Sequence, residues 1–212
     1  MKKKLQPLAL EEIRSLHREK KQAIRKRLAE FAAVAPNDYF YECAYCLLTP
    51  QSSAENAAQA EKALRANDFQ HTDFDPEPLL HRKEYYIRFH KTKAKHLQQL
   101  KRQFPEILSR LINGGSSPQL REWLVKNVKG LGWKEASHLL RNIGHRDLAI
   151  LDRHILKNLV RAGVMKQLPK TLTAKRYLEI ERKFSMFAKS IKIPMDELDL
   201  LFWSIGTGEI LK

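Results

Sequence analysis

Two residues in the second half of the chain have side chains that could do covalent chemistry together. Lys134 carries an amine, which is a nucleophile once it has lost its proton. Asp152 follows eighteen residues later, and its carboxylate can stabilise positive charge that develops on a reacting carbon. Taken alone, Lys134 is a solvated lysine and Asp152 a helix cap. Whether the two side chains can react together therefore depends on the turns and helices that position them.

A glycine-containing turn directly precedes Lys134. The turn runs from Val128 to Gly132, with the apolar Leu131 between Gly130 and Gly132. Glycines let backbone amides approach a phosphate closely, and the helix that follows presents its positive dipole end. A plain turn between two helices fits the glycine spacing equally well. The spacing therefore predicts a helical hairpin over residues 118–143 and leaves its role open.

The helix after this turn has one apolar side. Its stripe places Lys134 on the opposite side, free to face DNA or solvent, and consists of Ala136, Leu139, Leu140 and Ile143. Periodicity does not choose between those two surroundings.

The composition favours an anionic partner. The 212 residues include 39 Lys and Arg against 24 Asp and Glu, a net charge of +15. A charge of this size attracts phosphate, and no helix combines a lysine-rich face with a long apolar one, so nucleic acid is favoured over a membrane. The basic start at residues 1–4 is not followed by an apolar signal segment. We expect a soluble cytoplasmic protein.

The two cysteines, Cys43 and Cys46, lie in an apolar run. Their C-x-x-C spacing could mark a redox pair or half of a zinc site, but there is no second pair and no βαβ pattern around them. We interpret both as buried small side chains in a reducing compartment.

Apolar residues recur at spacings of three and four along most of the chain, and strand patterns are scarce, which predicts a nearly all-helical fold. Pro105 is expected to end one basic helix and begin a shorter one. Residues 67–77 are expected to form a surface loop, and residues 113–118 are the clearest linker. The expected helices cover residues 10–34, 42–49, 53–66, 86–104, 105–111, 118–128, 134–143, 152–162, 173–191 and 194–205.

The hairpin, Lys134, a short helix, a bend, an apolar pair and then Asp152 and His154 resemble the helix-hairpin-helix DNA glycosylases. The branch that carries an iron-sulfur cluster needs four cysteines near the C-terminus, and no cysteine follows Cys46. Three segments are similar to the small archaeal-type 8-oxoguanine DNA glycosylase/AP lyases: residues 47–53, 87–94 and 201–212. This likeness spans about residues 41–212 and lacks an N-terminal β domain.

The resemblance implies an all-α fold in which two helical lobes, each mixing N- and C-terminal helices of a single unit over residues 1–212, flank a DNA-binding cleft. It implies a bifunctional, monomeric base excision repair enzyme that acts on double-stranded DNA containing an oxidised purine, 8-oxoguanine. Lys134 would attack C1′ of the deoxyribose and form a Schiff base, from which β-elimination cuts the strand. Asp152 would assist attack and base departure while it caps the helix that follows. No cofactor is expected to be required.

The same resemblance implies further site residues. An extruded base would stack on Phe89 and Trp203, and the final Lys212 would distinguish 8-oxoguanine from guanine. Gln51 would fill the hole left in the duplex, and His154 would contact a phosphate. A structural alkali metal ion would bind turn carbonyls and bridge to DNA; these belong to Lys126, Val128 and Leu131.

Without the resemblance, each of these residues has a plainer interpretation. Phe89 and Trp203 would be core residues, while Gln51 and His154 would be solvated. The basic face is either a solvated helix surface or a phosphate contact, and comprises Arg88, Lys91, Lys93 and Lys95. Two other functions also stay open: the same scaffold acting on another oxidised base, and a helix-hairpin-helix module that binds nucleic acid without chemistry.

Overall fold

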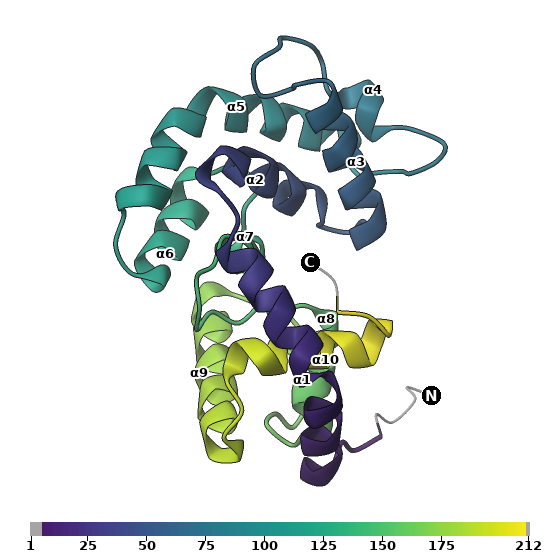
Figure 1. The fold of residues 1–212 in the computed structure, drawn as a ribbon, viewed down its shortest axis with the longest axis vertical. Coiled ribbons are helices and arrows are strands. Elements are labelled where there is room, and N and C mark those ends of the chain that lie inside the picture. The colour runs from purple at the N-terminus through teal and green to yellow at the C-terminus, as the bar shows by residue number, and fades with distance from the viewer. Residues whose placement is uncertain (1–5, 211–212) are drawn as a thin grey trace. The chain divides into compact units, whose positions relative to one another are not determined.

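The computed structural model describes residues 6–210, and these residues form α-helices joined by loops, with one short 3-10 turn and one isolated bridge between His81 and Tyr86 (Figure 1). The chain divides into two compact units. One unit combines the residues up to Ala32 with those from Gly144 onwards, and the other consists of Ala33–Ile143. The prediction of a nearly all-helical fold is confirmed.

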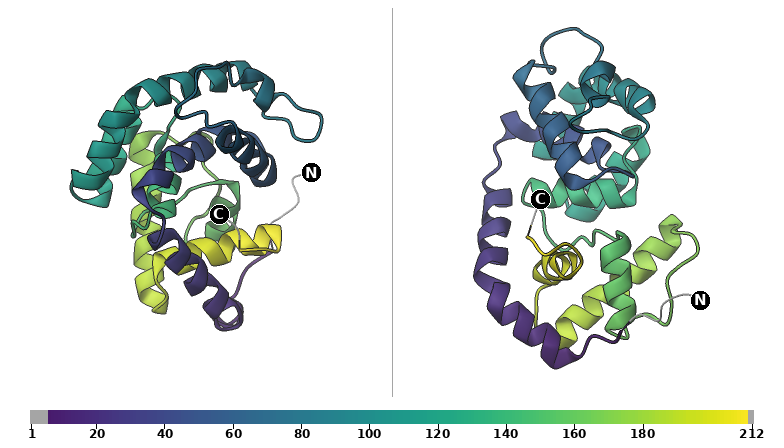
Figure 2. Two further views of the ribbon diagram at one scale, coloured as in Figure 1. Left: turned by 45° about the horizontal axis from the view of Figure 1, so that its top comes forward. Right: turned by 90° about the vertical axis from the view of Figure 1, so that its right-hand side faces the viewer.

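The unit formed by residues 33–143 is built around helix α2, Tyr39–Leu48. Helices α3 (Ala54–Ala66), α5 (His90–Asn113) and α7 (Trp133–Asn142) all contact α2 (Figure 2). Every residue from Phe40 to Leu48 is therefore buried. The expected burial of the two cysteines is confirmed, and burial raises the pKa of the Cys43 thiol well above its ordinary value. A short 3-10 turn, Pro36–Asp38, leads into α2, which therefore begins three residues before the position expected from sequence.

Helix α5, His90–Asn113, corrects the prediction that Pro105 separates two helices. Proline in a helix interior removes one hydrogen bond and costs about 3 kcal/mol. A single buried stripe continues past Pro105 on the same face, so packing outweighs this cost; it comprises Leu97, Leu100, Phe104, Ile107 and Leu111. Residues 86–89, expected to begin the helix, are not helical, and the short helix α4, Glu77–Leu80, starts at the last residue of the expected loop 67–77.

Local capping sets the ends of the helices near the hairpin. Ser53 accepts a hydrogen bond from the Asn56 amide at 3.1 Å and caps α3. Ser116 and Gln119 form a capping box that starts α6, Ser117–Asn127. Five residues separate the end of α6 from the start of helix α7, Trp133–Asn142.

The other unit is built around α10, Met195–Thr207, which α1 (Leu10–Ala32), α8 (Arg153–Arg161) and α9 (Ala174–Ile191) all contact. Three acidic residues near the start of α10 are buried: Asp196, Glu197 and Asp199. Each accepts hydrogen bonds from a neighbouring segment, which explains how a buried carboxylate is tolerated. Among residues 6–210, no helix has the length and apolar content needed to cross a membrane.

Glu197 ties α10 to α1. Its Oε2 lies 2.6 Å from His17 Nε2, and its Oε1 accepts from Arg25 Nε at 3.0 Å. Burial acts to raise the pKa of Glu197, but the hydrogen bonds from His17 and Arg25 outweigh burial and leave the pKa below its ordinary value of 4.5. A lowered carboxylate pKa contributes stability that is present above pH 4.5 and is lost as the pH falls through the folded-state value.

We therefore expect Glu197→Gln to lower the free energy of unfolding by about 1–2 kcal/mol at neutral pH. The difference from the unsubstituted protein should shrink as the pH drops below 4.5. Urea denaturation at several pH values measures both effects. Glu179→Gln, which removes an exposed ion pair to Lys183 on α9, is the control and should change little. A difference for Glu197→Gln that does not vary with pH would contradict this account.

Candidate active site

The hairpin between α6 and α7 needs glycine at Gly130. Its φ of +93° lies in the left-handed region, and a Cβ there would come within 2.6 Å of His96 Nδ1 and 2.8 Å of Leu47 Cδ2. Leu131 next to it is buried, and its amide donates to the Val128 carbonyl at 3.2 Å. The turn is therefore pressed against α2 and α5, which fixes the direction in which α7 begins.

A buried arginine on α6 contacts α7 and so links the two helices of the hairpin. Arg121 on α6 is 1% exposed, lies 5.0 Å from the centre of the Trp133 ring and donates to Ser137 Oγ at 3.1 Å. Guanidinium groups stack on aromatic faces, so this contact combines packing with a hydrogen bond. Sequence reasoning missed Arg121, although the apolar Leu120 and Leu124 on the same helix mark the side that is buried.

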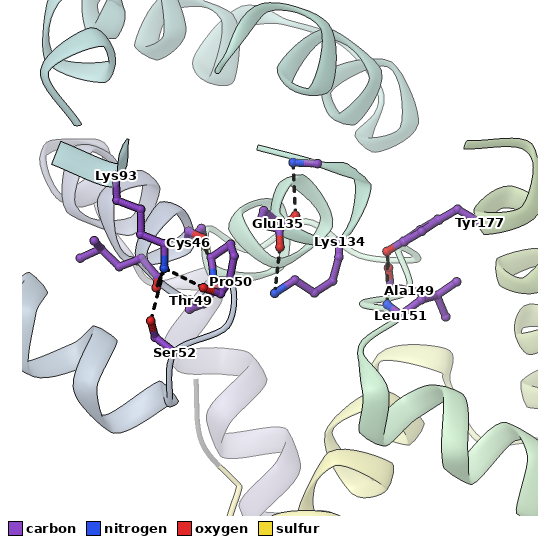
Figure 3. A network of polar contacts seen from close by, with 12 residues as sticks. Cys46, Thr49, Pro50, Ser52, Lys93, Lys134, Glu135, Ala149, Leu151 and Tyr177 are labelled. Carbon is purple, nitrogen blue, oxygen red and sulfur yellow. Dashed lines mark hydrogen bonds and ion pairs between the residues drawn. The ribbon is translucent and has the colours of Figure 1, made fainter. Parts of the chain in front are cut away.

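Lys134 stands at the start of α7 and is held by its neighbour Glu135 (Figure 3). Glu135 Oε1 lies 3.0 Å from Lys134 Nζ, while Oε2 accepts from the Gly132 amide at 3.2 Å. One carboxylate thus binds both the helix N-terminus and the lysine. The side chain of Lys134 is 24% exposed, so its amine is neither fully solvated nor buried.

Lys93 corrects the interpretation of the basic face of α5. Its neighbours Lys91 and Lys95 are exposed, but Lys93 is only 5% exposed. Its Nζ donates to the carbonyls of Leu48 and Pro50, each at 2.7 Å (Figure 3). A signal was present in the sequence, since Lys93 occupies the buried stripe of α5 one turn before Leu97.

Asp152 is the N-cap of α8. Its Oδ1 accepts from the amides of His154 at 2.7 Å and Ile155 at 2.8 Å. Both capping bonds use the same oxygen, so Oδ2 is not needed for the cap. Asp152 is half-buried, which leaves its carboxylate partly accessible. The structure shows the capping role expected for Asp152, and this role is compatible with a second task for the same group.

Side chains from α9 and α10 hold the irregular segment that leads to Asp152. Consecutive amides outside a helix need acceptors when they are buried. The Ala149 amide donates to Glu181 Oε1 at 2.8 Å, and the Ile150 amide to Asp199 Oδ2 at 3.1 Å. Tyr177 Oη accepts from the Leu151 amide at 3.2 Å and donates to the Ala149 carbonyl at 2.5 Å (Figure 3).

His154, Trp203 and Gly206 meet where α8 contacts α10. The rings of His154 and Trp203 lie edge to face, with centroids 6.3 Å apart. A Cβ on Gly206 would come within 2.1 Å of His154 Nδ1, so only glycine allows this approach. Trp203 is half-buried, whereas Phe202 beside it is fully buried.

Phe89 and Gln51 share an unusual backbone. Phe89 has φ +61° and Gln51 has φ +56°, in the left-handed region where side chains other than glycine are uncommon. Phe89 is 51% exposed, and the Arg88 guanidinium lies 5.0 Å from its ring centre. Exposure of Phe89 excludes the core interpretation for this ring. Lys212, the last predicted site residue, lies outside the described residues.

The predicted residues thus fall into two local groups. The unit formed by residues 33–143 holds Gln51, Phe89, Gly130, Gly132 and Lys134, and the other unit holds Asp152, His154 and Trp203. The positioning side chains that sequence reasoning missed are Arg121, Glu135, Glu181, Tyr177 and Asp199. Arg121, Tyr177 and Asp199 are buried on their helices, whereas Glu135 and Glu181 are half-buried.

A helical hairpin closed by Gly130, followed by a helix that Asp152 caps, is the local architecture of the helix-hairpin-helix class. A family model described as 8-oxoguanine DNA glycosylase matches residues 24–193. The chain therefore belongs to the 8-oxoguanine DNA glycosylase family.

Individual relatives agree over nearly the whole chain. The 8-oxoguanine DNA glycosylase/AP lyase of Fusobacterium nucleatum is 42% identical, over 95% of this chain and 96% of the relative. That of Methanocaldococcus jannaschii is 34% identical, over 99% of this chain and 98% of its own length. The crystal structure of the M. jannaschii enzyme with a 15-mer DNA containing 8-oxoguanine matches with a TM-score of 0.86 and 34% identity, covering 96% of this chain and 99% of that one.

Tyr177 offers a test of how the segment before Asp152 is held. Tyr177→Phe removes one hydroxyl that satisfies two buried backbone groups, and we expect it to lower the free energy of unfolding by about 1–3 kcal/mol. Thermal or urea denaturation measures this change. Tyr86→Phe, at a side chain that is 47% exposed, is the matched control. Equal stability of the Tyr177→Phe variant and the unsubstituted protein would show that the hydroxyl does not hold the segment.

Proposed function

We propose that this protein removes 8-oxoguanine from double-stranded DNA and then cuts the strand, using Lys134 as nucleophile and Asp152 as its carboxylate partner. The observation that carries the proposal is the placement of Lys134 at the first turn of α7, held by Glu135 beside the hairpin amide of Gly132. The family membership supports it, because relatives similar over almost the full chain are named 8-oxoguanine DNA glycosylase/AP lyases.

The chemistry follows from the two groups. The neutral amine of Lys134 gives its electron pair to C1′ of the deoxyribose, and the bond from C1′ to the base breaks. Asp152 stabilises the positive charge that develops on the sugar as the base departs. Loss of the amine proton and opening of the sugar ring give a Schiff base to Lys134. β-Elimination from this intermediate breaks the strand on the 3′ side, and water then releases the lysine.

We propose that the hairpin binds the DNA backbone. A net charge of +15 favours phosphate binding, and the N-terminus of α7 presents amides and a positive dipole end. His154 would add a phosphate contact. The carbonyls of Lys126, Val128 and Leu131 would hold an alkali metal ion; hard carbonyl oxygens at the end of α6, where Val128 leaves helical geometry, suit such a cation. When bound, the ion would supply positive charge beside a phosphate.

A base inside a duplex has to be extruded before a lysine can reach C1′. We propose that Phe89 and Trp203 stack on the extruded base and that Lys212 contributes to its recognition. The exposed ring of Phe89 and the half-buried ring of Trp203 support this assignment. Gln51 would occupy the space vacated in the duplex. The protein would act as a monomer on the nucleoid DNA of a prokaryotic cytoplasm, since one chain supplies every group named.

Borohydride trapping tests the nucleophile. Reduction during incubation with a duplex containing 8-oxoguanine should link protein to DNA covalently, because borohydride reduces the Schiff base to a stable amine. Lys134→Gln should abolish the linked species and leave duplex affinity nearly intact. Lys183→Gln, at an exposed lysine of α9, is the control and should trap normally. Trapping that persists in Lys134→Gln would assign the nucleophile to another amine.

Asp152→Asn separates capping from catalysis. Asparagine caps helices about as well as aspartate, so stability should stay within about 0.5 kcal/mol. It carries no negative charge, so single-turnover base removal should fall by roughly 100-fold or more. Calorimetry and strand-release assays measure the two effects. Normal turnover in a normally folded variant would show that Asp152 is a helix cap alone.

A further inference from the structure

One buried ammonium is shared by three acceptors on a single turn. Besides the carbonyls of Leu48 and Pro50, Lys93 Nζ donates to Ser52 Oγ at 3.3 Å. A protonated lysine has three N–H donors, and three acceptors match that number. Leu48 is the last residue of α2, so its carbonyl belongs to the negative end of that helix dipole.

The turn held in this way carries Gln51 between two of the acceptors. Gln51 is exposed and has φ +56°, a conformation that persists only where surrounding contacts impose it. The Ser52 amide donates to the Thr49 carbonyl at 3.1 Å, which closes the turn. Lys93 therefore supplies hydrogen bonds that hold this turn in a backbone conformation that Gln51 does not favour on its own.

The same contacts reach the segment before Phe89. Ser52 Oγ accepts from the Arg88 amide at 3.1 Å as well as from Lys93. Asn56 Nδ2 donates to the Tyr86 carbonyl at 3.1 Å, which adds a second link between these segments. One hydroxyl thus couples the Gln51 turn to the residue next to the exposed ring of Phe89.

The charge of Lys93 fits this role. Burial and, to a smaller extent, the positive charge of Lys134 lower its pKa to about 8, against the opposing effect of Glu135. A pKa of about 8 leaves the ammonium mostly protonated at neutral pH, with all three donors available.

We infer that Lys93 is a positioning residue, a buried clamp that holds the turn at residues 48–52 so that Gln51 enters the duplex and Phe89 meets the extruded base. This inference deepens the proposed function and rests on it. Lys93 touches neither substrate nor reacting atoms; it acts through Gln51 and, by way of Ser52, through Phe89.

Amide hydrogen exchange of the free protein tests the clamp without DNA. Lys93→Met keeps the length and apolar stem of the side chain but removes its three donors, and we expect the Ser52 amide to exchange at least about tenfold faster. Lys62→Met, at an exposed lysine of α3, is the charge-matched control and should leave that amide unchanged. Unchanged exchange in Lys93→Met would overturn the clamp.

A double-substitution cycle tests whether Lys93 affects DNA binding through Gln51. All proteins carry Lys134→Gln so that the DNA stays intact, and the affinity for a duplex containing 8-oxoguanine is measured. Gln51→Ala and Lys93→Met should each weaken it about fivefold, and both together by about five- to tenfold, because in the absence of the Gln51 side chain Lys93 can act only through Phe89. Independent action would give about 25-fold, and that outcome would overturn the inference. Fluorescence of a 2-aminopurine placed next to the lesion should fall in parallel with the affinity, because it reports extrusion of the base.

Two further controls keep the outcomes distinct. Should Lys93→Met fail to fold, Ser52→Ala replaces it, since it removes the third acceptor and the link to Arg88; unchanged affinity and fluorescence there would overturn the inference. Failure of the proposed function has a different signature, in which the unsubstituted protein neither excises 8-oxoguanine nor forms a trapped species.

Discussion

The site segments of this protein depend on one constraint, which is that buried backbone groups outside a helix must find hydrogen-bond partners. The segment before Asp152 exposes amides to the interior, and carboxylates and a phenol accept from them. The turn around Gln51 presents carbonyls instead, and an ammonium donates to them. Neither segment is helical, and each is held by side chains that supply what its backbone lacks: acceptors for the amides before Asp152 and a donor for the carbonyls around Gln51.

Burying these charged side chains costs free energy, because they are removed from water. Asp199 and Lys93 both lie on buried faces of helices, where apolar residues are the usual occupants. Their removal from water is offset by hydrogen bonds to the backbone. Burial of such groups therefore serves the precision of the loops they hold, in keeping with the view that functional sites need supporting contacts behind them.

The two units are packed in a similar way. Each has one largely buried helix, α2 in one and α10 in the other, and three further helices contact it. The hairpin is fixed from the α2 side through Gly130, and the cap of α8 is approached from the α10 side through Gly206. At both positions a side chain larger than hydrogen would clash with a neighbouring group.

The sequence by itself determined the helical class, most of the helices, the cap at Asp152 and the family. It did so because helical periodicity, capping chemistry and glycine turns are local properties, and because the pattern around Lys134 and Asp152 resembles one family. It failed at Pro105, where the continuous apolar stripe of α5 outweighs the cost of proline. Tertiary structure alone decided that Lys93 is buried among carbonyls, that Glu135 holds Lys134, and that Tyr177 supports the approach to Asp152. Some of those contacts join residues from different helices, and others fix one of several orientations open to a charged side chain. Only tertiary packing determines them.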